Sequence, residues 1–476
     1  MPLFGTRGAA SVTGFGGLAK LGYLLRNSLR FRASNSAYLS RTPAGAGNQK
    51  TWTWSGWVKR GVLGSASTLI SGGGTTGRLA LFFNGSDQLE IDVGGTGSFQ
   101  TSTAVFRDPA AWYHVVWAFD TTQGTGANRS RIYVNGTELS LTQTRTFTQN
   151  TDYAINGTGI QTHGTLSNSI GGYNFDGYLT EINFVNAQQL TPSSFGKTDA
   201  VTGQWIPIKY GSTYGTNGFY LKFDDSSAVG KDSSGNGNNW STSGHSVTPG
   251  VTYDLMTDVP TLTSATAANY GVFNAVSAYS DLPIINANIQ TSAVPSGSDW
   301  YSRSTTMGFS SGKIYAEFSM PSITSGSQGS PVGFGIIPST TDFSASGQLV
   351  GDANRGYGFY CPDTSGSETP KKRVAGTSTS VGTASATITT DTFMVAFDLT
   401  NGNGWFGKNG TWYAGDPAAG TGASITGITA REYIFGLSLY RDTTFTNNTA
   451  AINFGQRPFA YTPPSGFKSL NAYNLP

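Results

Sequence analysis

The chain has 476 residues, more than one ordinary hydrophobic core accommodates, and this length predicts two or three domains. Only 12% of the residues are charged while 13% are aromatic, which excludes a disordered chain, and 64 glycines favour short strands joined by many turns. We therefore predict an all-β fold. The single cysteine, Cys361, excludes an internal disulfide framework, and no apolar run reaches the roughly 18 residues that a membrane span requires.

The charge is unevenly distributed, although the net charge is only +2. The first 86 residues carry ten Lys or Arg and no acid, whereas the remainder carries 19 basic and 27 acidic residues. A basic front end predicts docking onto an acidic partner, and the absence of a basic motif interleaved with aromatic residues disfavours nucleic acid.

Residues 1–33 are predicted to be an N-terminal anchor segment. Their start, GTRGAASVTGFGG, is too rich in small residues to hold a core, so it is expected to lie extended on a partner; a flexible tail remains the alternative. Glycines and Lys20 interrupt the apolar residues there, so we expect no secretory signal and synthesis in a cytoplasm.

Residues 34–200 contain a regular series of short strands. TWTWSGWVKR (51–60) alternates in polarity, and WYHVVWAFD (112–120) is apolar almost throughout, which predicts a central buried strand. Asn-Gly pairs at 84–85 and 135–136 predict hairpins. These residues are predicted to form the first sandwich.

The rest of the chain divides less evenly. Residues 201–299 are predicted to be a connecting region with one extra strand, GFYLKFDD, and a polar loop, KDSSGNGNNW. Residues 300–457 again show strands, among them GKIYAEFSM and YIFGLSLY, and the proline-rich residues 458–476 are predicted to form a C-terminal strap.

The two strand-rich units share a local pattern. In each, an Ala-Phe-Asp sequence ends an apolar strand (118–120 and 396–398), and the next strand turns at Asn-Gly (135–136 and 409–410). The Asp is expected to cap the turn that follows. Two copies of one supersecondary unit predict two related sandwiches.

Several of these motifs are similar to those of known families. FRASNSAYLSRTP, WTWSGWVK, WYHVVWAFD, RIYVNG and IGGYNFDGYLTEINF resemble laminin G-like domains of the concanavalin lectin/glucanase superfamily. SSGKIYAEF, VAFDLTNG and WFGKNG in the second unit resemble SPRY domains. The resemblance implies two concanavalin-like, or jelly-roll, antiparallel β-sandwiches in series behind a short N-terminal anchor.

The two ends of the chain, GTRGAASVTGFGG and NFGQRPFAYTPPSGFKSLN, resemble structural proteins of tailed phages. This resemblance implies a virion protein assembled in the host cytoplasm, as a tail fibre or other appendage that adheres to a host-surface glycan. Other virion proteins are the expected partners of residues 1–33, and a homotrimer is the expected oligomer. The alternative is a capsid or tail decoration protein with a purely structural role.

An enzyme is not expected. Glucanases of this fold use a Glu-x-Asp-x-x-Glu strand, whose two glutamates act as nucleophile and acid. The nearest match is Glu90-Ile91-Asp92, and Gly95 stands at the second glutamate position. His114 lies inside an apolar strand and is predicted to be a core histidine, and Glu181 is predicted to lie at the rim or edge of a sheet.

Two groups of residues are candidate sites. Tyr173, Asn174, Asp176 and Tyr178 lie beside glycines, where rings and short polar side chains suit a sugar; the alternative is that they fill the sandwich. Asp225, Asp232 and Asn236 offer oxygen ligands around a glycine-rich loop, which suits calcium. The same residue types also stabilise turns, so both a calcium site and a purely structural loop remain open.

Overall fold

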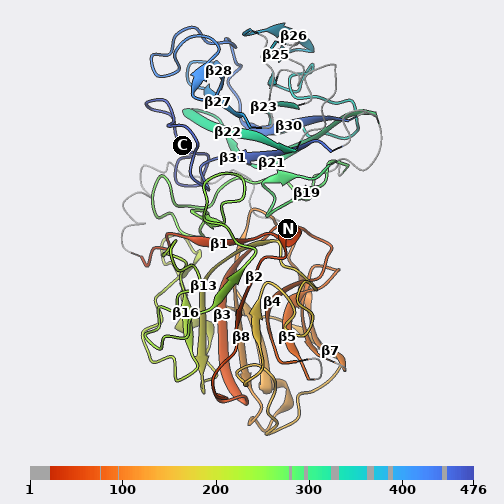
Figure 1. Cartoon of the computed structure of the whole chain (residues 1–476), viewed down its shortest axis with the longest axis vertical. Coiled ribbons are helices and arrows are strands. Elements are labelled where there is room, and N and C mark those ends of the chain that lie inside the picture. Colours follow the sequence, from red (N-terminus) through yellow and green to blue (C-terminus); the bar gives the residue numbers. More distant parts are fainter. Residues whose placement is uncertain are drawn as a thin grey trace. The chain divides into compact units, whose positions relative to one another are not determined.

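Figure 1 shows the computed structural model of the chain, which describes residues 22–74, 77–94, 96–277, 281–293, 298–322, 332–361, 369–383, 390–441 and 447–475. Within them the protein is all-β, as predicted, and its large antiparallel sheets form two sandwiches. Residues 22–248 and Thr252–Thr263 belong to the first sandwich, and the second contains residues 264–475. No helix in the described part of the chain has the length and hydropathy needed to cross a membrane.

Sheet A of the first sandwich has eight strands. They are β1 (Ser28–Phe31), β3 (Thr51–Arg60), β8 (Trp112–Asp120), β9 (Ser130–Val134), β10 (Thr137–Glu138), β13 (Gly177–Asn186), β16 (Phe219–Leu221) and β18 (Leu255–Met256). Their order is β10-β9-β8-β3-β13-β1-β18, and β16 pairs with β13 beyond the end of β1.

Sheet B of the first sandwich also has eight strands. They are β2 (Tyr38–Arg41), β4 (Ser67–Gly72), β5 (Leu79–Phe83), β6 (Gln88–Val93), β7 (Gly97–Val105), β11 (Leu141–Gln143), β12 (Gln161–His163) and β17 (Ser241–Ser243), in the order β11-β7-β6-β5-β4-β12-β2-β17. A separate hairpin joins β14 (Gly196–Thr198) to β15 (Trp205–Pro207). Three short 3-10 helices are η2 (Ala33–Asn35), η3 (Gly126–Arg129) and η4 (Pro192–Ser194).

Aromatic side chains fill the space between sheets A and B. Trp52 and Phe119 stack with ring centroids 4.7 Å apart, and Trp117 meets Trp52 edge to face at 4.8 Å. All three rings are fully buried. The alternation of β3 and the apolar run of β8 place these rings on the inner face, so the two strands predicted to be central do lie in the core.

Residues outside 34–200 complete the first sandwich. Strand β1, which falls inside the predicted anchor segment 1–33, is buried and pairs with β13, while residues 1–21 of that segment lie outside the described residues. Strands β16, β17 and β18, from the predicted connecting region 201–299, pair with β13, β2 and β1. These pairings give sheets A and B partners for edges that would otherwise be open.

The outer face of sheet A is covered by residues 252–258. Cross-strand register places Arg30, Tyr178, Lys59 and Trp112 in one row on this face. Asp258 accepts hydrogen bonds from Lys59 Nζ at 2.7 Å and from Trp112 Nε1 at 3.1 Å. The row is therefore buried even though it points away from the main core.

The second sandwich consists of a seven-stranded and a six-stranded sheet. The seven strands are β19 (Ile284–Ile285), β20 (Gln290–Thr291), β31 (Thr449–Asn453), β22 (Lys313–Ser322), β27 (Thr392–Asp398), β28 (Asn403–Lys408) and β29 (Thr411–Trp412), in this order across the sheet. The six are β21 (Asp299–Phe309), β30 (Tyr433–Arg441), β23 (Val332–Pro338), β24 (Tyr357–Tyr360), β25 (Lys371–Val374) and β26 (Thr377–Ser380), again in sheet order.

The local pattern shared by the two units is confirmed. Phe119 and Phe397 are both fully buried, Asp120 accepts a hydrogen bond from Thr122 N at 2.9 Å, and Asp398 accepts one from Asn401 N at 3.1 Å. The Asn-Gly turns at 135–136 and 409–410 have positive φ at both residues, as two-residue hairpin turns require. The turn after β5 differs: it spans 84–87, and Asp87 rather than Gly85 has the positive φ.

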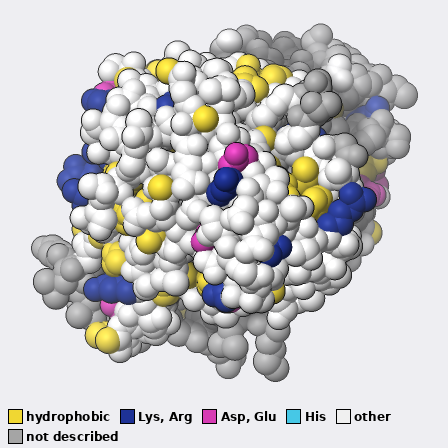
Figure 2. All heavy atoms as spheres, turned by 90° about the horizontal axis from the view of Figure 1, so that it is seen from below, with side chains coloured by type: hydrophobic (Ala, Val, Ile, Leu, Met, Phe, Trp, Pro, Cys, Tyr) yellow, Lys and Arg dark blue, Asp and Glu magenta, His cyan; other side chains and the backbone are white. Residues whose placement is uncertain are grey.

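The surface matches the low charge of the sequence. Figure 2 shows one face of the molecule, on which Lys, Arg, Asp and Glu side chains are scattered and most of the area is uncharged side chain or backbone. On this face the basic side chains do not merge into a single patch.

Candidate functional site

The loop before β13 exposes one of the predicted sugar-binding residues. Tyr173 is 46% exposed, its φ of 51° is unusual for an aromatic residue, and its carbonyl accepts a hydrogen bond from Thr68 N at 2.8 Å. Its ring lies beside Phe82. Asn174 is half-buried and donates from Nδ2 to Ser36 Oγ at 3.2 Å. This loop therefore presents an exposed aromatic ring.

The other two predicted sugar-binding residues are buried, so the structure corrects their assignment. Asp176 is 4% exposed, and its side chain accepts a hydrogen bond from Ala33 N. Tyr178 is fully buried in the covered row on sheet A, with Lys59 Nζ 5.8 Å from its ring centroid. Strand alternation alone would leave Tyr178 on an open face, and residues 252–258 close that face. Neither side chain is available to a ligand.

The loop predicted to bind calcium is organised by one of its own carboxylates. Asp232 accepts four hydrogen bonds: Oδ1 from Tyr220 N and Ser234 N at 2.9 and 2.8 Å, and Oδ2 from Ser234 Oγ and Asn238 N at 2.8 Å each. Both lone-pair positions of each oxygen are thus used by donors from the loop and from Tyr220. Asp232 is a turn-stabilising residue here.

The two other predicted calcium ligands are also engaged. Asn236 donates from Nδ2 to the carbonyls of Gly215 and Gly218 at 2.6 and 2.8 Å. Asp225 accepts from Lys231 Nζ at 3.1 Å, and hydrogen bonds from Ser227 and Lys231 lower the pKa of Asp225 to about 2. No cluster of three or more His, Cys, Asp or Glu side chains within the described ranges is arranged to hold a metal ion. The local geometry matches the structural-loop alternative.

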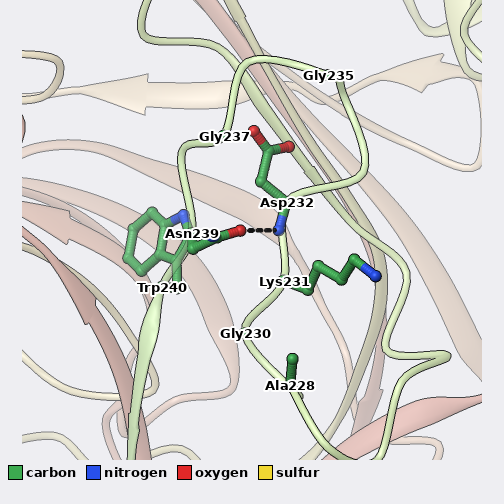
Figure 3. A pocket seen from close by; sticks show the side chains of 8 residues that line it. All are labelled: Ala228, Gly230, Lys231, Asp232, Gly235, Gly237, Asn239 and Trp240. Carbon is green, nitrogen blue, oxygen red and sulfur yellow. Dashed lines mark hydrogen bonds between the residues drawn. The ribbon is translucent and has the colours of Figure 1, made fainter.

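The same loop forms an open pocket of about 540 Å³, which we call the loop pocket. It is lined by Ala228, Gly230, Lys231, Asp232, Gly235, Gly237, Asn239 and Trp240 (Figure 3). Asn239 Oδ1 accepts a hydrogen bond from Asp232 N at 2.8 Å, and the Lys231 side chain extends away from the Asp232 carboxylate. Lys231 and Asn239 are exposed, whereas Asp232 and Trp240 are buried.

The pocket is held rigidly. Trp240 N donates to Gly230 O at 2.8 Å, and a Cβ on Gly230 would lie 1.9 Å from Trp240 O, so no other residue fits at position 230 without a backbone shift. Arg41 donates to Asn238, which in turn donates to the carbonyls of Thr216 and Gly218. These bonds fix the loop before any ligand arrives, which reduces the entropic cost of binding.

The sequence identified this loop and one residue that lines its pocket, Asp232, but not the other lining residues. Lys231, Asn239 and Trp240 all lie in the segment KDSSGNGNNW, whose oxygen-rich composition drew attention to Asp232 and Asn236 instead. Asp232 and Asn236 form hydrogen bonds with residues 215–220, which pack against the loop. This contact determines which side chains of the loop stabilise the turn and which remain exposed.

The nearest match to a glucanase motif lies on β6. The burial of β6 alternates, with Leu89, Ile91 and Val93 buried and Glu90 and Asp92 on the opposite face. Asn84 Nδ2 donates to Glu90 at 2.9 Å, and Arg78 forms an ion pair with Asp92. Gly95 lies outside the described residues.

Glu181 is not at a rim, which corrects the prediction. It is 3% exposed, has a φ of 54°, and lies at an irregularity in the register of β13 with β3 between Thr180 and Asn183. Tyr220 Oη donates to its carboxylate at 2.7 Å, and the hydroxyls of Tyr23 and Tyr220 are 2.5 Å apart. Burial raises the pKa of Glu181 to about 7.

The predicted core histidine is confirmed. His114 is 1% exposed, and burial lowers its pKa to about 3. Trp205 Nε1 donates to His114 Nδ1 at 2.9 Å, so the ring proton lies on Nε2, which donates to Ser55 Oγ at 2.8 Å. All of its polar atoms are used structurally.

Comparison with solved structures finds similar β-sandwiches at low identity. A provisionally assigned carbohydrate-binding protein from Bacteroides ovatus is 18% identical over 46% of this chain, with a TM-score of 0.32, and the chain spans 58% of that protein's length. The SPRY domain of human HERC1 is 14% identical over 34% of this chain and 87% of its own, with a TM-score of 0.26. A pentraxin from Limulus polyphemus is 13% identical over 39% of this chain and 93% of its own, with a TM-score of 0.29.

The strands and their registers define the fold of this chain. No curated protein matches the chain. The family model of the concanavalin A-like lectin/glucanases superfamily matches residues 33–194, about a third of the chain. This segment supplies most of the strands of sheets A and B. Residues 33–194 therefore match the concanavalin A-like lectin/glucanases model and form most of the first of the two sandwiches in this all-β chain.

Proposed function

We propose that this protein binds glycans without cleaving them and that the loop pocket is the binding site. The observation that carries the proposal is the pocket itself: about 540 Å³, preorganised, and attached to a domain of lectin-like fold. This volume falls in the range of ligand pockets, roughly 300–1,000 Å³. Exposed polar side chains on a rigid loop suit the hydroxyl groups of a sugar, because each hydrogen bond forms without ordering the protein.

The absence of cleavage is part of the proposal. Glu90 and Asp92 are the carboxylates nearest to a glucanase pattern, and each already has a polar partner. A retaining glycosidase needs one carboxylate as a free nucleophile and a second as an acid about 5–5.5 Å from it. We expect bound oligosaccharides to be recovered intact.

The biological setting that we propose is the virion of a tailed phage, with the sandwiches displayed as part of a tail fibre or other appendage that adheres to the host surface. The support is the resemblance of both chain ends to structural proteins of such phages. A decoration protein with a purely structural role is the alternative, and it predicts no glycan ligand.

Glycan-array binding tests the site. Asn239→Asp keeps the oxygen that accepts from Asp232 N but removes the Nδ2 donor, so the loop should stay folded while affinity for the bound glycan falls about tenfold, the effect of one lost hydrogen bond. Tyr173→Ala is the matched control on the other candidate loop and should leave affinity unchanged. Loss of binding in Tyr173→Ala alone would move the site to that loop, and no bound glycan at all would favour the decoration protein.

Deletion of residues 2–21 tests the anchor. Leu25 is buried and its backbone bonds to Thr261 and Thr263, so the deletion must stop before it to leave the sandwich intact. We expect an unchanged melting temperature and loss of incorporation into particles, measured by immunogold electron microscopy. Incorporation at wild-type occupancy would place the attachment surface on the sandwiches.

A further inference from the structure

We propose that the loop pocket recognises the anionic group of an acidic sugar, such as a uronic or sialic acid residue, rather than a neutral sugar. This inference rests on the proposed function and adds the class of ligand. It is based on the side-chain donors and acceptors of the pocket that are not used by hydrogen bonds within the loop.

The only acidic side chain that lines the pocket cannot accept from a sugar. Asp232 already receives two hydrogen bonds on each carboxylate oxygen and is 8% exposed. Neutral sugars usually need an acceptor as well as donors, because every hydroxyl group both donates and accepts. Asn239 Oδ1 is also occupied, by Asp232 N.

The side-chain groups left for a ligand are donors. Lys231 is exposed and carries three N–H donors and a positive charge, and Asn239 is exposed with no protein partner for Nδ2 among the described residues. Trp240 Nε1 has no hydrogen-bond partner in the described part of the chain either, but it is buried against the core and is not among the donors that a ligand can reach. A set of exposed donors that includes one cation, held by an exposed ion pair with Asp225, fits an acceptor-only group such as a carboxylate.

The Asp225 carboxylate competes with a ligand carboxylate for the ammonium group of Lys231. Its carboxylate holds Lys231 Nζ at 3.1 Å, and the pair is open to solvent, with side-chain exposures of 55% for Lys231 and 30% for Asp225. An exposed pair of this kind is weak and exchanges readily with a ligand carboxylate. Asp225 does not itself line the pocket.

The test uses the full chain and an array of matched pairs: oligogalacturonates with their methyl esters, and sialylated glycans with their desialylated forms. The wild type is expected to bind the acid of a pair at least tenfold more tightly than its neutral partner. Affinity for the acid should fall as salt is raised, because the interaction is between exposed charges.

Three variants assign the effect to Lys231. Lys231→Gln should lower affinity for the acid about tenfold, whereas Asp225→Asn should raise it by releasing the lysine. Lys222→Gln is the matched control, because Lys222 is similarly exposed and pairs with Asp224, outside the pocket. It should change affinity less than twofold.

The outcomes separate this inference from the proposed function. Equal binding of acid and neutral partners, sensitive to Asn239→Asp, would overturn the acidic class and leave glycan binding in place. Acid binding that Lys231→Gln does not weaken would overturn the assignment to Lys231. Binding of neither member of any pair would overturn both proposals.

Discussion

Asp258→Ala is expected to lower the free energy of unfolding of the first sandwich by about 3–5 kcal/mol, the cost of leaving a buried charge without its partner. Lys59 and Asp258 are both fully buried, and their side chains are 2.7 Å apart. Burial lowers the pKa of Lys59, and Asp258 opposes that shift. Without Asp258 the lysine must remain charged in a poorly solvated site or lose its proton, and either change destabilises the fold.

Buried ion pairs beside Asp258 should increase the effect of the Asp258→Ala substitution on stability. Asp254, also fully buried, accepts from Arg30 and Arg32 at 2.9 Å, so residues 252–258 are held to sheet A by two carboxylates. Loss of the Asp258 carboxylate should loosen residues 252–258 and expose Tyr178. Hydrogen exchange of peptides from β8 and β13 in graded urea measures the loss of stability and its location.

Two controls test the electrostatic cause. Asp152→Ala breaks an exposed pair with Lys50 at 4.0 Å and should cost less than about 0.5 kcal/mol. The double variant Lys59→Met, Asp258→Leu removes both charges and should recover most of the stability, because apolar replacement of a buried pair is often neutral. A double variant as unstable as Asp258→Ala would show that packing, and not charge, determines the effect.

Glu181→Gln is expected to change how stability depends on pH. The pKa of Glu181 is raised from 4.5 to about 7 in the folded protein, so the unfolded chain loses this proton first as pH rises. The stability present below pH 4.5 is therefore lost as pH rises through 7. The shift corresponds to about 3 kcal/mol, and it applies nearly in full because Glu181 is 3% exposed.

The difference between wild type and Glu181→Gln isolates this group. Gln retains the oxygen that accepts from Tyr220, so at pH 5 the two proteins should have similar stability, whereas at pH 8 the variant should be more stable by about 3 kcal/mol. Three histidines have lowered pKa values, His114, His163 and His245, and their effect is the same in both proteins, so it cancels in the difference.

Urea unfolding at several pH values measures this difference. Glu138→Gln is the control, because Glu138 is half-exposed beside Arg131 and its substitution should change stability by less than about 1 kcal/mol. A constant difference for Glu181→Gln from pH 5 to pH 8 would mean that Glu181 is ionised throughout, with its charge compensated by Tyr23, Tyr220 and the nearby Lys209 and Lys222.

Local patterns in the sequence predicted several of the long strands. The alternation of residues 51–60, the apolar run at 112–120 and the Asn-Gly turns at 135–136 and 409–410 each depend on neighbouring residues only, and each appears as predicted. The all-β class and the repeated Ala-Phe-Asp strands follow from the same short-range constraints.

The candidate site could be predicted only in part. The composition of segment 231–240 predicts a polar loop rich in oxygen ligands, but it does not show that the turn itself uses Asp232, because one of the four donors, Tyr220 N, lies outside the loop. Tyr178 was assigned to a ligand because nothing in strand alternation shows that residues 252–258 cover it.

The class of the fold, the central strands and the tight turns can therefore be predicted from the residues alone, because interactions within a few residues set them. Long-range contacts determine which polar side chains form hydrogen bonds within the protein and which remain exposed to solvent. Glu181 became a buried acid because β1 and β16 pair along one edge of β13. Lys231 and Asn239 became available because segment 215–220 satisfies the rest of their loop, and such long-range pairing leaves no periodic trace in the sequence.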